Sequence, residues 1–381
     1  MVQNLPKGFS SKLDKGAYLW YHIIWRGKIR QIARLFCGTW KRIKKMKICV
    51  LGAGTWGSAL ASLLAKNNHD VMLWSAIPAE IAELSKSGTH KNLPGAIMPV
   101  GITYTTLIDE AMRGAEICLF VVPSQFIRST AERVAPYVED GQILVNAAKG
   151  IESGSLLTMT EVITDALSYS GCKANYYISA LSGPTHAEEV ALGLPTSIVA
   201  ASEWEDVSLK IADAFKNSCL RVYTNSDVLG VELCGALKNI IAIAAGICRG
   251  IDFGDNAKAM LITRGMREIT RLGIAMGCNR ETFNGLAGIG DLIVTSTSHH
   301  SRNNRCGELI GRGLSYAEAS EQIGMVVEGY HALKAALELS DKYSVDMPIT
   351  RGVDKVINGN QSPYVVIREL MTRDVKDELT I

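Results

Sequence analysis

The 381-residue sequence lacks the cysteine patterns of a disulfide framework or a structural zinc site. Its nine cysteines are odd in number and scattered, and no Cys-x-x-Cys pair occurs. This usage is typical of reduced thiols in a cytosol and favours a cytoplasmic protein. The sequence has no HExxH motif, and the adjacent His299 and His300 cannot easily share one metal ion. We therefore expect no metal site.

Long uninterrupted apolar runs are missing as well. The longest, Ile240 to Cys248, is far shorter than the roughly 20 residues that a membrane-spanning helix needs. We therefore expect no integral membrane segment. With 47% hydrophobic and 20% charged residues, the chain can bury a core and is not a disordered sequence.

A strong overall charge is also lacking, but the charge is unevenly distributed. Residues 1–45 hold eleven Lys or Arg and one acid, a net charge of +10. The remaining 336 residues carry 29 bases and 37 acids, a net charge of −8. Because this body is mildly acidic, it offers no general attraction for nucleic acid, and we expect no nucleic-acid partner.

The first 45 residues differ in composition from the rest, being basic and rich in Trp and Tyr. Three interpretations compete. The segment can be sequence upstream of a start at Met46 or a disordered tail, it can lie on an anionic membrane surface, or it can be a cleaved transit peptide. We expect the segment to be dispensable for activity.

From Met46 onward the pattern alternates short apolar runs with helical stretches. Strands are expected at 47–51, 71–74, 117–122, 142–148, 176–181, 196–201 and 220–224. Helices alone are expected beyond residue 228, at 228–249, 257–276, 304–312, 315–323, 328–343 and 349–358. The first pattern predicts a Rossmann-type, mainly parallel sheet domain over 46–235, and the second an all-helical C-terminal domain over 236–381.

The sequence GAGTWG, residues 52–57, matches the G-x-G-x-x-G pattern between the first strand and its helix. Gly52 permits a tight turn, Gly54 lets the backbone approach a pyrophosphate, and Gly57 lets helix and strand pack closely. This context predicts a dinucleotide site. Its cofactor can be NAD or NADP, because Ser75 at the end of the second strand can hydrogen-bond either and no charge there selects one.

Polar residues follow several other strands or precede helices. Lys149 comes directly after a strand, where a ligand contact and an ordinary surface lysine are both possible. Thr185 and His186 stand where a helix starts, and His186 is better read as a cap or an exposed histidine than as a base. The segment 301–304, SRNN, combines an arginine with hydroxyl and amide donors that suit a phosphate.

Together these segments resemble the bacterial-type NAD(P)-dependent glycerol-3-phosphate dehydrogenases. The resemblance rests on GAGTWGSALA, VVPSQ, AAKGIE, SGPTHAEEV, ELCGALKNIIAIAAGI, GIGDLIVT, SRN and VVEG in this order, and it runs from Met46 to near Glu369. It implies a cytoplasmic, usually dimeric oxidoreductase that interconverts sn-glycerol 3-phosphate and dihydroxyacetone phosphate. Such an enzyme supplies glycerol 3-phosphate for phospholipid synthesis.

The resemblance also implies roles for individual residues. Lys238 matches the catalytic proton acceptor, with Lys149 and Asp291 beside it at the reacting carbon. The implied substrate contacts are Lys149, Gly183, Thr185, Lys238, Asp291, Ser301, Arg302 and Asn303. The expected cofactor contacts from the glycine loop and the end of strand two are Gly52, Gly54, Gly57 and Ser75. The resemblance adds Thr55, Trp56, Lys149, Ala187, Arg302, Val326 and Glu328. Members often carry His or Arg where this chain has Ala76 and Ile77, which leaves the choice between NAD and NADP open.

Lys238 lies among small and apolar residues on its helix, and such burial lowers the pKa of a lysine toward the range of a useful base. Two other functions compete with this one. The chain can be a two-domain dehydrogenase of a hydroxyacid or hydroxyacyl substrate, or a nucleotide-sensing Rossmann protein without catalysis. Neither would need Lys238, Asp291 and the SRN segment together.

Overall fold

The structure, a computed structural model, describes residues 44–375, 377 and 378. These residues fall within one compact unit. The basic extension expected over 1–45 lies, up to residue 43, outside the described residues.

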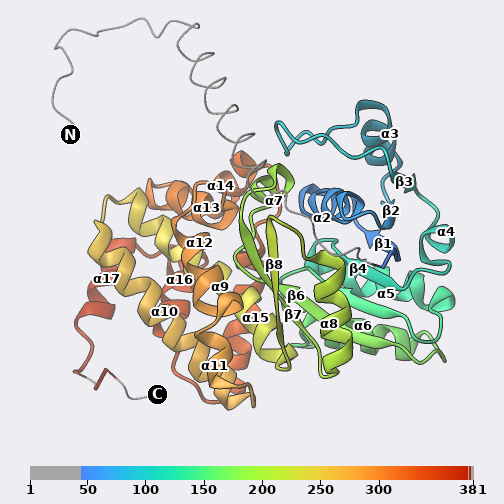
Figure 1. The fold of residues 1–381 in the computed structure, drawn as a ribbon. Coiled ribbons are helices and arrows are strands. Elements are labelled where there is room, and N and C mark those ends of the chain that lie inside the picture. The colour runs from blue at the N-terminus through green and yellow to red at the C-terminus, as the bar shows by residue number, and fades with distance from the viewer. Residues whose placement is uncertain (1–43, 376, 379–381) are drawn as a thin grey trace, which may run out of the picture. The chain divides into compact units, whose positions relative to one another are not determined.

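Eight strands form a single sheet in the order β3-β2-β1-β4-β5-β6-β7-β8 (Figure 1). They are β1 (Lys47–Leu51), β2 (Asp70–Trp74), β3 (Ile102–Thr105), β4 (Ile117–Phe120), β5 (Ile143–Asn146), β6 (Tyr177–Ser182), β7 (Thr196–Ala201) and β8 (Leu220–Asn225). All neighbouring strands are parallel except β6 and β7. The predicted mainly parallel sheet is therefore confirmed, with one strand, β3, that the sequence analysis did not predict.

Alternate residues of each strand bury themselves on opposite faces of the sheet, as the two-residue repeat of a strand requires. Ile48 and Val50 of β1 pack toward α2 (Thr55–Lys66), α3 (Pro78–Ser87) and α8 (Glu205–Phe215). Cys49 and Leu51 pack toward α4 (Ile108–Met112), α5 (Ile127–Val134) and α6 (Met159–Tyr169). Helices on both faces explain why the strand sequences are apolar almost throughout.

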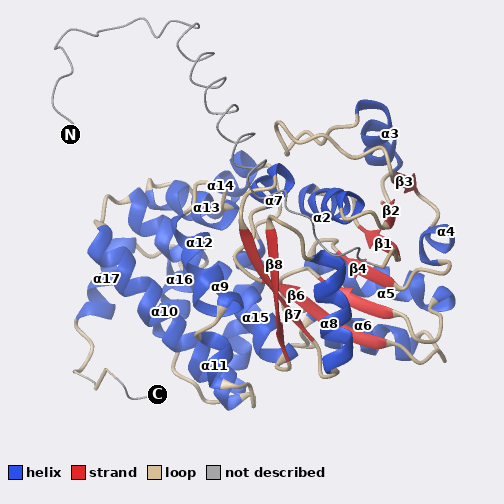
Figure 2. Cartoon of the chain, viewed as in Figure 1, coloured by secondary structure: helices blue, strands red, loops and turns tan. Residues whose placement is uncertain are grey.

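Beyond β8 the described chain is helical, as predicted (Figure 2). The helices are α9 (Val228–Gly250), α10 (Asp255–Ala275), α11 (Arg280–Phe283), α12 (Asp291–Thr297), α13 (Arg302–Gly311), α14 (Tyr316–Ile323), α15 (Glu328–Lys342), α16 (Pro348–Ile357) and α17 (Pro363–Met371). Six of these match expected helices, whereas α11, α12 and α17 were not predicted. The residue where we divided the two predicted domains, 235, lies inside α9.

Helix α9 forms the centre of the helical part, and 19 of its 23 residues are buried. It is long and apolar enough to cross a membrane by length and composition, which the search for uninterrupted apolar runs did not reveal, but 89% of the apolar window lies inside the protein. Glycines let α13 pack directly onto it. A Cβ atom on Gly246 would lie 2.0 Å from the carbonyl oxygen of Asn304, and one on Gly307 would lie 2.0 Å from that of Ile243. This close approach packs α13 against the second half of α9.

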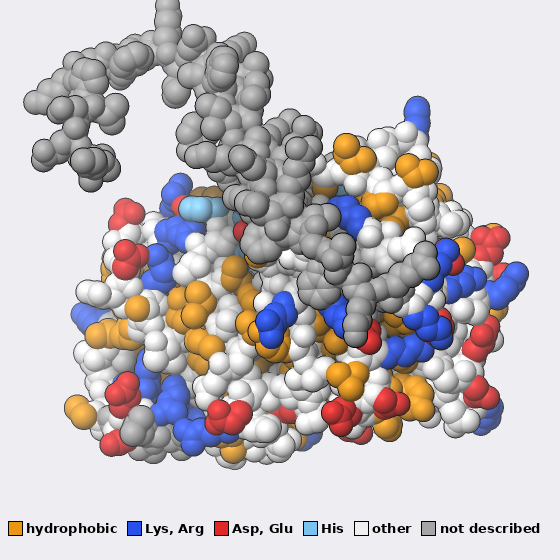
Figure 3. Space-filling model, viewed as in Figure 1, with side chains coloured by type: hydrophobic (Ala, Val, Ile, Leu, Met, Phe, Trp, Pro, Cys, Tyr) orange, Lys and Arg blue, Asp and Glu red, His pale blue; other side chains and the backbone are white. Residues whose placement is uncertain are grey.

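The visible surface of the described chain mixes charged side chains of both signs with apolar ones (Figure 3). Basic and acidic side chains are both scattered over this face, in keeping with the 29 bases and 37 acids of residues 46–381.

Candidate active site

The glycine loop between β1 and α2 has the backbone geometry that its three glycines were expected to allow. Gly52 has a φ of +125°, which L side chains rarely adopt, and a Cβ atom on Gly57 would lie 1.9 Å from the carbonyl oxygen of Gly52. A Cβ atom on Gly54 would meet nothing within 4 Å, so this face of the loop is open to a ligand. The N-terminus of α2 has no side-chain cap and no acid in its first turn. These features fit the pyrophosphate of a dinucleotide, which Gly54, Thr55 and Trp56 would hold through backbone N–H groups.

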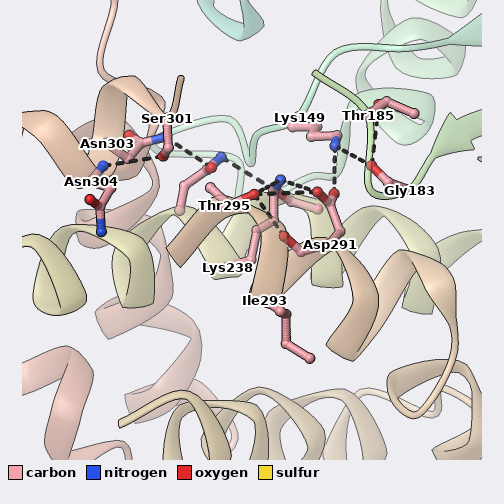
Figure 4. Close-up of polar contacts among 12 residues, drawn as sticks. Lys149, Gly183, Thr185, Lys238, Asp291, Ile293, Thr295, Ser301, Asn303 and Asn304 are labelled. Atoms are coloured by element: carbon pink, nitrogen blue, oxygen red, sulfur yellow. Dashed lines mark hydrogen bonds and ion pairs between the residues drawn. The ribbon is translucent and has the colours of Figure 1, made fainter. Parts of the chain in front are cut away.

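Lys238, in the middle of α9, points into a buried polar cluster with Asp291 and Thr295 (Figure 4). Its ammonium donates a hydrogen bond to Oδ1 of Asp291 and another, 2.5 Å long, to Oγ1 of Thr295. The side chains of Lys238 and Asp291 are only 6% and 1% exposed. Asp291 and Thr295 are four residues apart on α12, which puts both on the face of the helix that contacts α9.

Lys149 reaches the same carboxylate from the loop that follows β5. Its Nζ atom lies 2.5 Å from Oδ2 of Asp291 and donates a second hydrogen bond, 3.2 Å long, to the carbonyl oxygen of Gly183. Thr185 Oγ1 donates to this carbonyl oxygen too, at 3.2 Å. One aspartate thus holds two lysines, which come from the sheet part and from the helical part of the chain.

The charges in this cluster shift one another's protonation. Burial lowers the pKa of Lys238 to about 7, Asp291 opposes this change, and the nearby charge of Lys149 adds to it. Burial alone would raise the pKa of Asp291, but Lys149 and Lys238 together hold it below its ordinary value. The cluster therefore contains an ionised carboxylate and a lysine that can exchange a proton near neutral pH.

The SRN segment lies next to this cluster, at the start of α13 (Figure 4). Ser301 is the N-cap residue, and its hydroxyl accepts a hydrogen bond from the backbone N–H of Asn304. Asn303 donates to Oδ1 of Asn239, the residue after Lys238, at 2.9 Å. Arg302 donates to the carbonyl oxygen of Val326 at 3.3 Å, and burial lowers the pKa of Arg302 although Glu328 and Glu188 oppose the change.

The remaining predicted cofactor residues lie at element ends on the sheet side of this cluster. Glu328, the first residue of α15, accepts hydrogen bonds from the backbone N–H and the hydroxyl of Ser124, at 3.3 and 2.6 Å. Ala187 begins α7 (Ala187–Leu192), and Ser75 follows β2. No hydrogen bond within the described residues joins Ser75 or Ala187 to the two lysines.

Several side chains that shape the site escaped the sequence analysis. Thr295 was missed because α12 was not predicted. Glu232, a buried residue that precedes Lys238 on α9, accepts a 2.6 Å hydrogen bond from Asn146 and further ones from Thr160. The amide of Asn146 in turn bonds both the N–H and the carbonyl of Ala148, so this chain of contacts holds the loop that carries Lys149. The sequence did carry one sign of this role, because an acidic residue such as Glu232 is unusual inside so apolar a helix.

No hydrogen bond or ion pair among the described residues joins His186, His299 or His300 to the two lysines or Asp291. The rings of His186 and His300 lie 5.6 Å apart, and burial, aided by Lys238, lowers the pKa of His186. Within the described residues, no group of three or more His, Cys, Asp or Glu side chains lies where it could hold a metal ion.

Comparison with known proteins extends this picture. A sequence model of the NAD-dependent glycerol-3-phosphate dehydrogenase N-terminus matches residues 47–208, and one of the C-terminus matches residues 227–368. A glycerol-3-phosphate dehydrogenase (NAD(P)+) 2 from Lactobacillus delbrueckii subsp. bulgaricus is 55% identical over 334 residues, which are 88% of this chain and 99% of that protein. A glycerol-3-phosphate dehydrogenase (NAD(P)+) from Fusobacterium nucleatum is 45% identical over 335 residues, covering 88% and 99%. The crystal structure of glycerol-3-phosphate dehydrogenase from Coxiella burnetii superposes with a TM-score of 0.81 at 35% identity, covering 86% and 99% of the two chains.

Proposed function

The chain belongs to the family of NAD-dependent glycerol-3-phosphate dehydrogenases, and from this premise we propose how its residues perform the reaction. It is an oxidoreductase that uses NAD or NADP and interconverts sn-glycerol 3-phosphate and dihydroxyacetone phosphate. A nicotinamide cofactor held at the glycine loop would supply the chemistry of hydride transfer. The protein has to place the substrate, stabilise charge on its C2 oxygen, and move one proton to or from that oxygen.

Lys238 is the proposed proton carrier, and its burial with a pKa of about 7 is the observation that carries the proposal. In oxidation the neutral amine takes the proton of the C2 hydroxyl, and in reduction the ammonium returns it. An unperturbed lysine would be almost fully protonated at neutral pH and a poor base. The apolar wall of α9 and the charge of Lys149 remove this difficulty because both disfavour the ammonium form.

Lys149 and Asp291 complete the proposed catalytic group. A positive charge on Lys149 beside Lys238 stabilises the negative charge that develops on the C2 oxygen. Asp291 bonds both ammonium groups through its two oxygens and so sets the distance between them. Its ionised state keeps the cluster from holding two uncompensated positive charges before substrate binds.

The substrate phosphate is assigned to the start of α13. Ser301, Arg302 and Asn303 supply a hydroxyl, a guanidinium and an amide there, and the partial positive charge of a helix N-terminus favours an anion. Gly183 and Thr185, bonded to Lys149 through the Gly183 carbonyl, are assigned to the other end of the substrate. We assign the dinucleotide to the residues of the glycine loop and of strand two, to Lys149 and to the set Ala187, Arg302, Val326 and Glu328.

The two competing functions differ from this one in their substrate. A dehydrogenase of a hydroxyacid or a nucleotide sensor has no use for a phosphate site beside the lysine pair. The deciding experiment follows NADH and NADPH absorbance with dihydroxyacetone phosphate and with dihydroxyacetone. Rapid oxidation that depends on the phosphate is expected, and equal rates with the two ketones would contradict the proposal.

We further propose that the enzyme is a cytoplasmic homodimer that supplies glycerol 3-phosphate to phospholipid synthesis. Residues 46–235 form its dinucleotide-binding domain, and residues 236–381 carry Lys238 and the phosphate site, with residues of both parts contacting both ligands. Free thiols support a reducing compartment, since all eight cysteines among the described residues are unpaired. The proposals of a homodimer and of a role in phospholipid synthesis rest on the family and its small phosphorylated substrate. Light scattering of the purified chain tests the dimer, and restored growth of a glycerol-requiring bacterial strain tests the metabolic role.

A further inference from the structure

The end of β2 lies directly beside the glycine loop. The backbone N–H of Gly52 donates a 2.9 Å hydrogen bond to the carbonyl oxygen of Trp74, the last residue of β2. Ser75 follows at once and is 4% exposed. In a dinucleotide-binding fold this position meets the ribose that carries the 2′-hydroxyl of NAD or the 2′-phosphate of NADP.

A carboxylate reaches this position from the next helix, although the sequence places none at the strand end. Ser75 Oγ donates a 2.7 Å hydrogen bond to Oε2 of Glu80, and the same Oγ accepts one of 3.1 Å from the backbone N–H of Ile77. Glu80 lies in the first turn of α3 and is half-buried. The residues next to Ser75 in the sequence include no selecting charge, because Glu80 stands five residues farther along the chain.

The two cofactors respond to this carboxylate in opposite ways. A ribose hydroxyl can donate to Oε1 of Glu80, which accepts no hydrogen bond from any described residue. A 2′-phosphate would instead meet a like charge at the place where the first turn of α3 could otherwise attract it. Two bases near α3 could in principle attract the phosphate. His90 lies close enough to Glu80 and Glu83 to interact with their charges, but burial lowers the pKa of His90 and so disfavours its charged form. Its neighbour Lys91 is exposed.

We infer that Glu80, held in place by Ser75, makes this enzyme select NAD(H) over NADP(H). The inference rests on the proposed dehydrogenase function and adds a cofactor preference to it.

The Ser75–Glu80 contact could serve only to fasten a helix to a strand, and a second contact of the same kind in this chain allows that alternative to be tested. At the end of β3, Thr105 Oγ1 donates to Oε2 of Glu110 at 2.8 Å and accepts from the N–H of Leu107 at 3.0 Å. This is the same strand-to-helix connection at the same spacing, one strand farther from the glycine loop. If both carboxylates only fasten helices to strands, neutralising either one should affect the two cofactors equally.

The test measures kcat/KM for NADH and NADPH with dihydroxyacetone phosphate in the full chain and in the variants Glu80→Gln and Glu110→Gln. We expect the wild type to favour NADH by at least about tenfold. Glu80→Gln should raise kcat/KM for NADPH, lower that for NADH modestly, and shift their ratio by at least about tenfold. Glu110→Gln should leave the ratio unchanged.

Equal use of both cofactors by the wild type, an unchanged ratio in Glu80→Gln, or the same shift in Glu110→Gln would each overturn the inference. Calorimetric binding of NADH and NADPH to the same three proteins gives a second readout that needs no turnover. Selective NADH binding without oxidation by dihydroxyacetone phosphate would therefore refute the proposed function but support the role of Glu80. Thermal unfolding of each variant establishes that it is folded.

Discussion

Lys238 and Asp291 form an ion pair from which solvent is almost completely excluded, and the second oxygen of Asp291 is bonded to Lys149. The carboxylate favours the ammonium form of Lys238, whereas burial and Lys149 oppose it. Burial is the largest of these effects, so the balance leaves Lys238 able to release a proton near neutral pH. Binding of a phosphorylated substrate adds negative charge nearby and will therefore shift the pKa of Lys238 in the complex.

Replacing Lys238 with Ala should abolish turnover and leave cofactor binding intact. We expect kcat to fall about 10²- to 10⁴-fold, the usual contribution of a general acid or base. Asp291 keeps Lys149 as its partner, so no buried charge is left alone. Steady-state kinetics and NADH fluorescence titration measure the two quantities, with the exposed Lys334→Ala as the control. A variant that keeps wild-type kcat would remove Lys238 from the chemistry.

The rate should depend on pH in opposite senses for the two directions. Oxidation needs the neutral amine of Lys238, so its kcat/KM should rise as the pH passes the free-enzyme pKa of about 7 and then level off. Reduction needs the ammonium, so its kcat/KM should fall over the same range. Lys149→Met removes a positive charge that lowers the pKa of Lys238, and the limb should move to higher pH. A limb near pH ~10, the unperturbed value, would contradict the assignment.

Arg302→Ala should weaken the binding of the phosphorylated substrate. Loss of a charge-assisted hydrogen bond of about 2–3 kcal/mol corresponds to a rise of roughly 30- to 150-fold in KM for dihydroxyacetone phosphate. Activity with dihydroxyacetone, which has no phosphate, should change much less. Arg305→Ala, an exposed arginine on the same helix, is the matched control. Equal losses for the two ketones would argue against the phosphate role.

Gly246→Ala should destabilise the contact between α9 and α13. The added Cβ atom would lie 2.0 Å from the carbonyl oxygen of Asn304, so the two helices must separate. Overpacking of this kind costs about 1–3 kcal/mol in the free energy of unfolding, which urea denaturation measures. Gly101→Ala, where a Cβ atom meets nothing within 4 Å, should cost less than about 0.5 kcal/mol. Similar losses in both variants would mean that the close approach does not matter.

Glu268 should make the protein more stable at mildly acidic pH. This buried carboxylate of α10 accepts hydrogen bonds from the N–H groups of Ile349 and Thr350, yet burial raises its pKa to about 7. Between pH 4.5 and about pH 7 the folded state therefore binds more protons than the unfolded state. The stability that protonated Glu268 contributes is lost as the pH rises through this range.

The Glu268 contribution amounts to at most about 3 kcal/mol over that range. Unfolding free energies measured from pH 5 to 8 for the wild type and Glu268→Gln should differ in slope, and the exposed Glu321→Gln should match the wild type. Parallel curves for wild type and Glu268→Gln would show that Glu268 titrates normally.

The sequence was most informative where a single local rule decides the structure. The glycine loop and the apolar strands of the sheet were predictable because a buried parallel strand has to be apolar along its whole length. The strand β3, ITYT, escaped because it has only four residues, of which the two inner ones, Thr103 and Tyr104, are not buried. Helix α12, DLIVTST, escaped because Ile, Val and Thr favour strands, and packing against α9 overrides that preference.

The same limit applies to the site. Lys238, Lys149 and Asp291 could be assigned through the family resemblance, whereas their shared hydrogen bonds depend on how α9, α12 and the β5 loop meet. Thr295 and Glu80 lie four and five residues from their partners, and only the helix geometry turns those separations into contacts. The contacts of the lysines depend on tertiary packing and those of Thr295 and Glu80 on where a helix begins, and the sequence alone displayed neither.

Helix α9 is at once the hydrophobic centre of the helical part and the support of Lys238. Its first turns are tied to β5 and α6 through Glu232, and its last turns are locked to α13 through glycines. Heating cannot release the proton carrier while this helix stays packed, so inactivation and melting of the tertiary structure should follow one curve. The substrate must therefore come to a lysine that the packing of the fold holds in place.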